Sequence, residues 1–331
     1  MLPGWSVVLS ALVYLCALFA VAHVADRSGR RLMNGPARAT IYALALAVYC
    51  TSWTFYGSVG FAGRAGFDFL AIYLGPILVV GFAHKFVARV VRIAKAQNIT
   101  SIADFIGARY GKSECVAALV CLVAVIGALP YIALQLKAVS TSLGAVLAAS
   151  GMADSTTQPW PFFGDIAFVV ALVLAAFAMA FGTRQIDATE HQNGLVLAIA
   201  AESLVKLLAF LAIGLFVTYS LFDGFDDLIA KAQLAPSMSP PIWERSGSLI
   251  SFLTLTVLSG FAAILLPRQF HMMVVENRDV GDVRRAAWMF PLYLVLINLF
   301  VLPIAIAGEY LMAGSSIDRD MTVLLLPLQN Q

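Results

Sequence analysis

Eight long apolar segments run through the 331-residue chain, and they constrain its fold more than any other feature. They cover residues 5–25, 39–60, 69–91, 114–147, 164–182, 192–221, 247–267 and 286–312. A bilayer core about 30 Å thick needs roughly 20 apolar residues per helix, and these segments are about that long or longer. The sequence therefore predicts an all-α membrane protein with about eight transmembrane helices.

The composition excludes the soluble classes of protein. Hydrophobic residues make up 61% of the chain and charged residues only 12%, whereas soluble domains carry about 25% charged residues. A soluble enzyme, a nucleic-acid binder and a disordered chain all need more charge, so the lipid bilayer is the expected partner. The four cysteines and four histidines have no metal-ligand spacing, and we expect the cysteines to be small core residues.

The basic residues predict the orientation of the chain in the membrane. Fifteen of the 21 lysines and arginines fall in one set of alternate connections, four fall in the other set, and two lie within helices. The larger set is expected in the cytoplasm, which puts both chain ends outside. The connection after the seventh segment contributes Arg268, Arg278, Arg284 and Arg285 to this set.

The second segment carries hydroxyl and aromatic residues just before a series of glycines. These residues are Thr51, Ser52, Trp53 and Tyr56. Two interpretations are open: close helix packing through small residues, or a discontinuous helix whose freed carbonyls and hydroxyls face a solute or Na⁺.

A second candidate break is Ser259-Gly260, in the seventh segment. Interrupted helices in corresponding positions of two halves are typical of inverted-repeat transporters. The correspondence favours the discontinuous interpretation of the second segment.

Ionisable residues also occur inside the predicted spans. Glu202 and Lys206 are spaced i,i+4, which predicts an ion pair that serves either mutual neutralisation or a coupling role. Lys137 follows Gln135 in a helix that contains a proline. Two roles are equally open for this lysine: it lines a solute site, or it pairs with another polar group to stabilise the fold. Glu309 is expected to reach the outer interface.

Five motifs together resemble the sodium/solute symporter family. The resemblance is strongest to the symporter-like N-terminal membrane domain of bacterial sensor (hybrid) histidine kinases. The motifs are YCTSWTFYG (49–57), DFLAIYLGP (68–76), PYIALQLKAVS (130–140), AESLVKLL (201–208) and LPRQFHMMVVE (266–276).

The resemblance implies a five-plus-five inverted-repeat (LeuT-like) fold preceded by one extra helix. Residues 1–331 would form a single, C-terminally truncated domain: 1–36 as extra helix and linker, 37–221 as first repeat, and 247–331 as the start of the second. It also implies a Na⁺ site near Thr51 and Ser52. Because the eighth core helix of the family lies beyond this chain, that site is incomplete here.

The resemblance further implies which residues face the solute and what the protein does. The implied solute-lining candidates are Trp53, Tyr56, Gln135 and Ser259. The implied function is Na⁺-linked binding or transport of a small organic nutrient (a short-chain acid or amino acid) in the bacterial inner membrane, as the sensory input of a histidine kinase with its response regulator. The alternative is a fragment of a free-standing symporter; in neither case does this chain carry catalytic residues.

Overall fold

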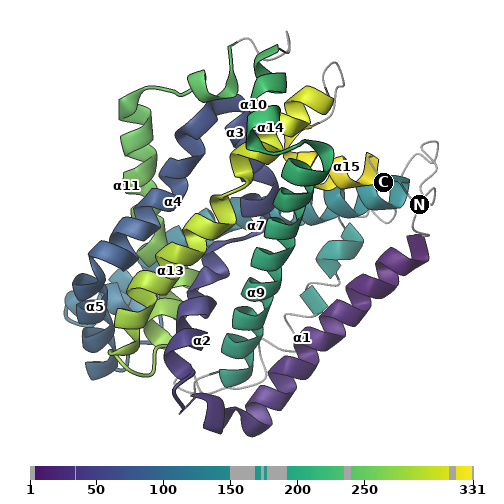
Figure 1. Cartoon of the computed structure of the whole chain (residues 1–331). Coiled ribbons are helices and arrows are strands. Elements are labelled where there is room, and N and C mark those ends of the chain that lie inside the picture. The colour runs from purple at the N-terminus through teal and green to yellow at the C-terminus, as the bar shows by residue number, and fades with distance from the viewer. Residues whose placement is uncertain are drawn as a thin grey trace.

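The computed structural model describes residues 4–33, 35–149, 168–172, 175–176, 192–234, 240–312 and 318–329. Every regular element within these residues is helical (Figure 1). The longest helices are α1 (Gly4–Met33), α7 (Glu114–Ala149) and α9 (Asn193–Phe216). Most of the predicted span 164–182 lies outside the described residues, so that prediction has no structural counterpart to compare.

Four helical segments of the described chain are long and apolar enough to cross a membrane. A fifth is added if a bent pair of helices counts as one span. The four are Trp53–Phe82, Glu114–Val146, Asn193–Leu221 and Asp282–Leu311, and the bent pair is Leu249–Leu265 with Pro267–Val275. The chain is therefore a multi-pass helical membrane protein with four to five such spans, and the higher number of eight stays a prediction.

The second predicted segment is a discontinuous helix. It begins as α2 (Arg38–Ala45), tightens into a 3₁₀ turn over Leu46–Tyr49, and is interrupted at Cys50, whose backbone is extended (φ −81°, ψ 109°). A π-helical turn over Trp53–Gly57 then leads into α3 (Ser58–Ala65). Of the two interpretations of this segment, the structure confirms the discontinuous helix.

The second break lies elsewhere than the sequence predicts. α11 (Leu249–Leu265) runs without interruption through Ser259 and Gly260, so the predicted break there is wrong. The chain breaks at Leu266, whose backbone is extended (ψ 128°), and then continues as α12 (Pro267–Phe270) and a π-helical turn over His271–Val275 at an angle of 56°. The cause is Pro267, because a proline disfavours the α conformation in the residue before it.

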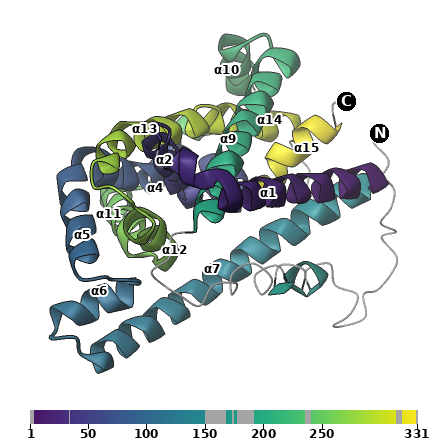
Figure 2. The same cartoon turned by 90° about the horizontal axis from the view of Figure 1, so that it is seen from below.

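The remaining helices surround the two discontinuous ones. α4 (Leu70–Pro76) packs closely on α11, while α13 (Asp282–Asn298) packs on α2 and α1 packs on α9. The other helices of the described chain are α5 (His84–Ala96), α6 (Ile102–Arg109), α10 (Phe225–Leu234), α14 (Val301–Leu311) and α15 (Thr322–Gln329). Figure 2 shows α7 crossing one side of the molecule beside α1.

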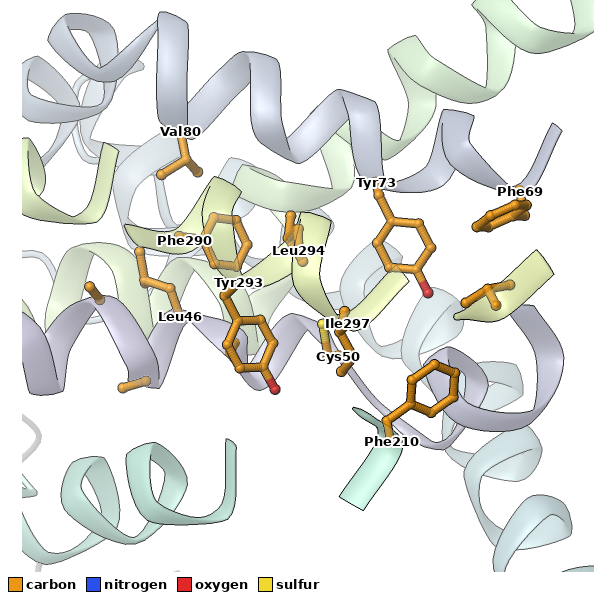
Figure 3. Close-up of a cluster of buried hydrophobic side chains, with 14 of the residues drawn as sticks. Leu46, Cys50, Phe69, Tyr73, Val80, Phe210, Phe290, Tyr293, Leu294 and Ile297 are labelled. Atoms are coloured by element: carbon orange, nitrogen blue, oxygen red, sulfur yellow. The ribbon is translucent and has the colours of Figure 1, made fainter. Parts of the chain in front are cut away.

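The buried core gathers around the break at Cys50. Figure 3 shows Cys50 close to Tyr73, Phe290, Tyr293 and other large side chains from α4, α9 and α13. Cys50 is fully buried, as expected of a core cysteine. That expectation is wrong for the other three cysteines, Cys16, Cys115 and Cys121, which are exposed on the surfaces of α1 and α7.

Opposite ends of the discontinuous helix are held by ion pairs. At the start of α2, Arg38 lies 2.8 Å from a carboxylate oxygen of Asp279 and 2.8 Å from one of Asp282. At the other end, Arg245 donates to the Gly63 carbonyl oxygen at 2.8 Å and lies 2.8 Å from Glu309 on α14. The Glu309 side chain is only 9% exposed and belongs to a charged network with Arg245 and Arg319; its position at the outer interface stays a prediction.

Candidate functional site

The two helix breaks lie against each other. Gln269, in α12, is fully buried, and its Nε2 donates a hydrogen bond to the Leu46 carbonyl oxygen at 3.2 Å. Arg268 and Gln269 both belong to α12, which packs on the 3₁₀ turn over Leu46–Tyr49. Discontinuous helices expose backbone groups that a continuous helix would pair, so two adjacent breaks form a polar region inside an apolar bundle.

The predicted ion pair of α9 lies at this region. Lys206 Nζ is 2.6 Å from a Glu202 carboxylate oxygen, which confirms the pair. Lys206 Nζ also donates to the Cys50 carbonyl oxygen at 3.4 Å. A cation is therefore placed directly against the backbone of the break, and its charge is balanced by the carboxylate one helical turn away.

The structure also brings together Ser52 and Gln135. The Ser52 hydroxyl donates to Gln135 Oε1, which joins the break to α7. Thr51 lies in the break itself, and its carbonyl oxygen accepts the Thr54 N–H at 2.9 Å. A hydroxyl that donates one hydrogen bond keeps its lone pairs, so the Ser52 oxygen can still accept a hydrogen bond or ligate a cation.

Two of the aromatic candidates follow the break. The Trp53 ring lies over Gly57, where an added Cβ would be 2.5 Å from two indole atoms. The same ring centroid is 6.5 Å from that of Tyr73 and 6.5 Å from that of Phe61. Tyr56 is half-buried and packs against the core.

Ser259 and Gly260 have a different environment. The Ser259 hydroxyl donates to the Ala71 carbonyl oxygen at 2.8 Å, across the contact between α11 and α4. A Cβ added at Gly75 would lie 2.2 Å from Ser259 Oγ and 2.3 Å from the Gly260 nitrogen. The structure thus places both residues in a very close helix crossing, the arrangement typical of small residues in membrane helices.

Lys137 is separate from Gln135 although it lies only two residues away. It is exposed on the surface of α7. Residues two apart do not share a helix face, so the contact of Gln135 with the break does not extend to Lys137.

Sequence reasoning missed Arg268 and Tyr131. The sequence pattern assigns Arg268 to a cytoplasmic connection, but the structure places it at the break between α11 and α12, inside the bent span that continues to Val275. Its guanidinium carbon is 4.4 Å from the centroid of the Tyr131 ring on α7. The apolar run that resumes directly after Gln269 is the signal that could have revealed this position.

Among the described residues at the break, three carry charges. Lys206 and Glu202 neutralise each other, which leaves the positive charge of Arg268. Within the described part of the chain, no group of three or more histidine, cysteine, aspartate or glutamate residues could hold a metal ion. The site therefore offers hydroxyls, amides, carbonyls and one unbalanced guanidinium.

Comparison with known proteins gives two symporters of Bacillus subtilis (strain 168). The uncharacterized symporter YhjB is 24% identical over 292 residues, which cover 87% of this chain and 55% of YhjB. The uncharacterized symporter YodF is 24% identical over 258 residues, which cover 76% of this chain and 47% of YodF. The chain thus spans about half the length of the curated relatives it matches.

No protein-family model and no solved structure matches the chain. The fold and the two relatives define its class at a coarse level: a multi-pass membrane protein with sequence similarity to bacterial symporters. This similarity supports a proposal of solute transport.

Proposed function

We propose that this chain belongs to a small-solute carrier in which the solute binds between the two discontinuous helices. The observation that carries the proposal is the contact of the two breaks, through Gln269 and the Leu46 carbonyl. Transporters with discontinuous helices bind their substrates at such breaks, because the freed backbone groups replace the water around the solute. The similarity to two symporters supports the same function.

We further propose that Na⁺ is the coupling ion and that Thr51 and Ser52 contribute to its site. Na⁺ prefers oxygen ligands, and the Ser52 hydroxyl and the backbone carbonyls of the break are of this type. Lys206 lies 3.4 Å from the Cys50 carbonyl oxygen, so its ammonium group opposes a second cation at that carbonyl by Coulomb repulsion. The ion is therefore expected on the Thr51–Ser52 side of the break.

Uptake into liposomes tests both proposals. The intact protein, reconstituted into liposomes, should accumulate labelled short-chain acids or amino acids when a Na⁺ gradient is applied, and should not do so with choline in place of Na⁺. Ser52→Ala should raise the Na⁺ concentration for half-maximal uptake by about tenfold, because a lost hydrogen bond or ligand costs about 1–1.5 kcal/mol.

The matched control is Ser140→Ala, since the Ser140 hydroxyl bonds only locally, to the Lys137 carbonyl oxygen on exposed α7. This variant should behave like the wild type. Uptake that is absent with every solute refutes the carrier function. Uptake that is equal with Na⁺ and choline refutes the Na⁺ coupling alone.

The sensory role rests on the resemblance of the five sequence motifs to kinase-linked membrane domains. We propose that solute occupancy of the break changes the activity of a histidine kinase in the same protein. The test is autophosphorylation of the intact protein in vesicles with and without the transported solute. A free-standing symporter, the alternative, shows uptake and no phosphorylation.

A further inference from the structure

Arg268 is a positive charge without a negative partner in the part of the chain that the structure describes. Its Nε atom is buried and has no hydrogen-bond partner there, and none of the described ion pairs includes Arg268. A charged side chain inside a membrane protein is costly unless it faces a partner, water or a ligand. Lys206, the other cationic side chain described near the breaks, differs in having an acidic partner, Glu202, at 2.6 Å.

The contact with Tyr131 does not use the hydrogen-bonding capacity of Arg268. A guanidinium group stacked on an aromatic ring interacts through its face, and its N–H donors point outward in its own plane. The Tyr131 hydroxyl is likewise buried without a hydrogen-bond partner among the described residues. Two side chains with unused donors, one charged and one neutral, are therefore stacked on each other, with the guanidinium carbon 4.4 Å from the ring centroid.

The pair lies at the helix breaks. Arg268 belongs to α12, which packs on the 3₁₀ turn over Leu46–Tyr49, and Tyr131 belongs to α7, which packs on the π-helical turn over Trp53–Gly57. Arg268 immediately precedes Gln269, the residue that joins the two breaks. A ligand held by this pair would contact both discontinuous helices and α7 together.

We propose that Arg268 and Tyr131 form the binding subsite for the carboxylate of an organic monocarboxylic acid. Arginine suits this role because its planar donors match the two oxygens of a carboxylate. The Tyr131 hydroxyl donates to one of those oxygens. A single carboxylate balances the one net positive charge of the described residues at the breaks, which is why a monocarboxylate fits better than a neutral solute or a dicarboxylate. This inference rests on the proposed solute-binding function and names its substrate class.

Thermal unfolding of the intact protein in lipid nanodiscs tests the proposal. The probes are acetate, propionate and lactate, each compared with its neutral amide: acetamide, propionamide and lactamide. At least one carboxylate should raise the unfolding temperature, and its amide should not. Arg268→Gln should weaken the apparent affinity for that acid at least tenfold, and Arg268→Lys should weaken it less, since lysine keeps the charge but loses the planar donors.

Two further variants separate binding from structure. Tyr131→Phe keeps the ring under the guanidinium and removes only the hydroxyl, so it should weaken carboxylate affinity by a few-fold while the unliganded protein unfolds as the wild type does. Arg285→Gln is the matched control, because Arg285 donates to the neutral hydroxyl of Thr40, at the far end of α2. Its carboxylate affinity should equal that of the wild type. If Arg268→Gln does not fold, Arg268→Lys and Tyr131→Phe decide the question.

Three outcomes overturn the subsite. They are stabilisation by no carboxylate of the series, equal stabilisation by acids and amides, and unchanged affinity in the Arg268 and Tyr131 variants. The subsite and the carrier function fail separately. If the protein takes up neutral solutes and the Arg268 variants take them up equally well, the carrier function stands and the subsite is refuted. If carboxylates bind in a manner that depends on Arg268 but are not taken up, the subsite stands and the carrier function is refuted.

Discussion

The ion pair between Arg245 and Glu309 should contribute more to stability than any exposed pair of this protein. Arg245 Nη1 lies 2.9 Å and 2.8 Å from the two carboxylate oxygens of Glu309. The two side chains are only 13% and 9% exposed. Arg245 also donates to the carbonyl oxygens of Pro240 and Gly63, both at 2.8 Å, and Arg319 approaches Glu309 to 3.3 Å. The pair thus joins α3, α14 and the segment before α11.

Glu309→Gln removes the negative charge and keeps the shape of the side chain. Breaking a buried ion pair costs about 3–5 kcal/mol, because the remaining charge stays buried. Arg245 keeps its two carbonyl acceptors, so the lower end of about 3 kcal/mol is expected. At about 2–4 °C per kcal/mol, the unfolding temperature should fall by about 6–12 °C.

Thermal unfolding in detergent, followed by tryptophan fluorescence, measures this change. The matched control is Asp227→Asn, which removes the acidic partner of Lys231 in an exposed i,i+4 pair on α10. Exposed pairs contribute little, so this variant should unfold within about 1 °C of the wild type. The double variant Arg245→Met/Glu309→Gln should be more stable than the sum of its single variants predicts. Equal unfolding temperatures for Glu309→Gln and Asp227→Asn would refute the reasoning.

Two further predictions concern the packing and the charged end of the bundle. Gly75→Ala should lower stability by about 1–3 kcal/mol, because its Cβ would lie 2.4 Å or less from three atoms of α11; Gly127→Ala, on the open surface of α7, should cause no loss in the same unfolding assay. The Gly281 N–H and then Arg38 lower the pKa of Asp279. The stability that this carboxylate contributes is therefore present above about pH 4 and lost as the pH falls further. The unfolding temperature of Asp279→Asn should depend less on pH between about 3 and 5 than that of the wild type. An equal pH dependence in the two proteins would show that Asp279 does not contribute this stability.

The sequence predicted local features of the fold better than distant contacts. The i,i+4 spacing of Glu202 and Lys206 was enough to predict their ion pair, because one helical turn fixes that distance. The contact of Lys206 with the Cys50 carbonyl could not be predicted, since it depends on how α9 packs against a segment 156 residues away. Helical periodicity carries no information on such packing.

The two helix breaks show the same limit. The hydroxyl and glycine pattern after Cys50 left open both close packing and a break, and the structure has a break there. The same type of pattern at Ser259-Gly260 indicated a break that the structure places six residues later, before Pro267. Small residues permit both a break and a close helix crossing, and only the partner helix decides between them. A proline disfavours the α conformation in the residue before it, which accounts for the break at Leu266, but α7 continues through Pro130 and α13 through Pro291.

Arg268 illustrates why a count of charges can misplace a single residue. Positive charges mark cytoplasmic connections on average, and Arg278, Arg284 and Arg285 follow the bent span in the sequence. Arg268 lies before a further apolar run and inside the bent span. Moving it leaves a large excess of basic residues in the same set of connections, so the predicted orientation does not depend on it.

The candidate solute and ion sites share one helix, α7. Tyr131 and Gln135 lie one helical turn apart on this helix, and they contact Arg268 of one discontinuous helix and Ser52 of the other. Most of its large apolar side chains are exposed in the described structure, and in Figures 1 and 2 it crosses the bundle obliquely. Because the two contacts lie within one turn of the same helix, a change in the position of α7 would alter both of them together.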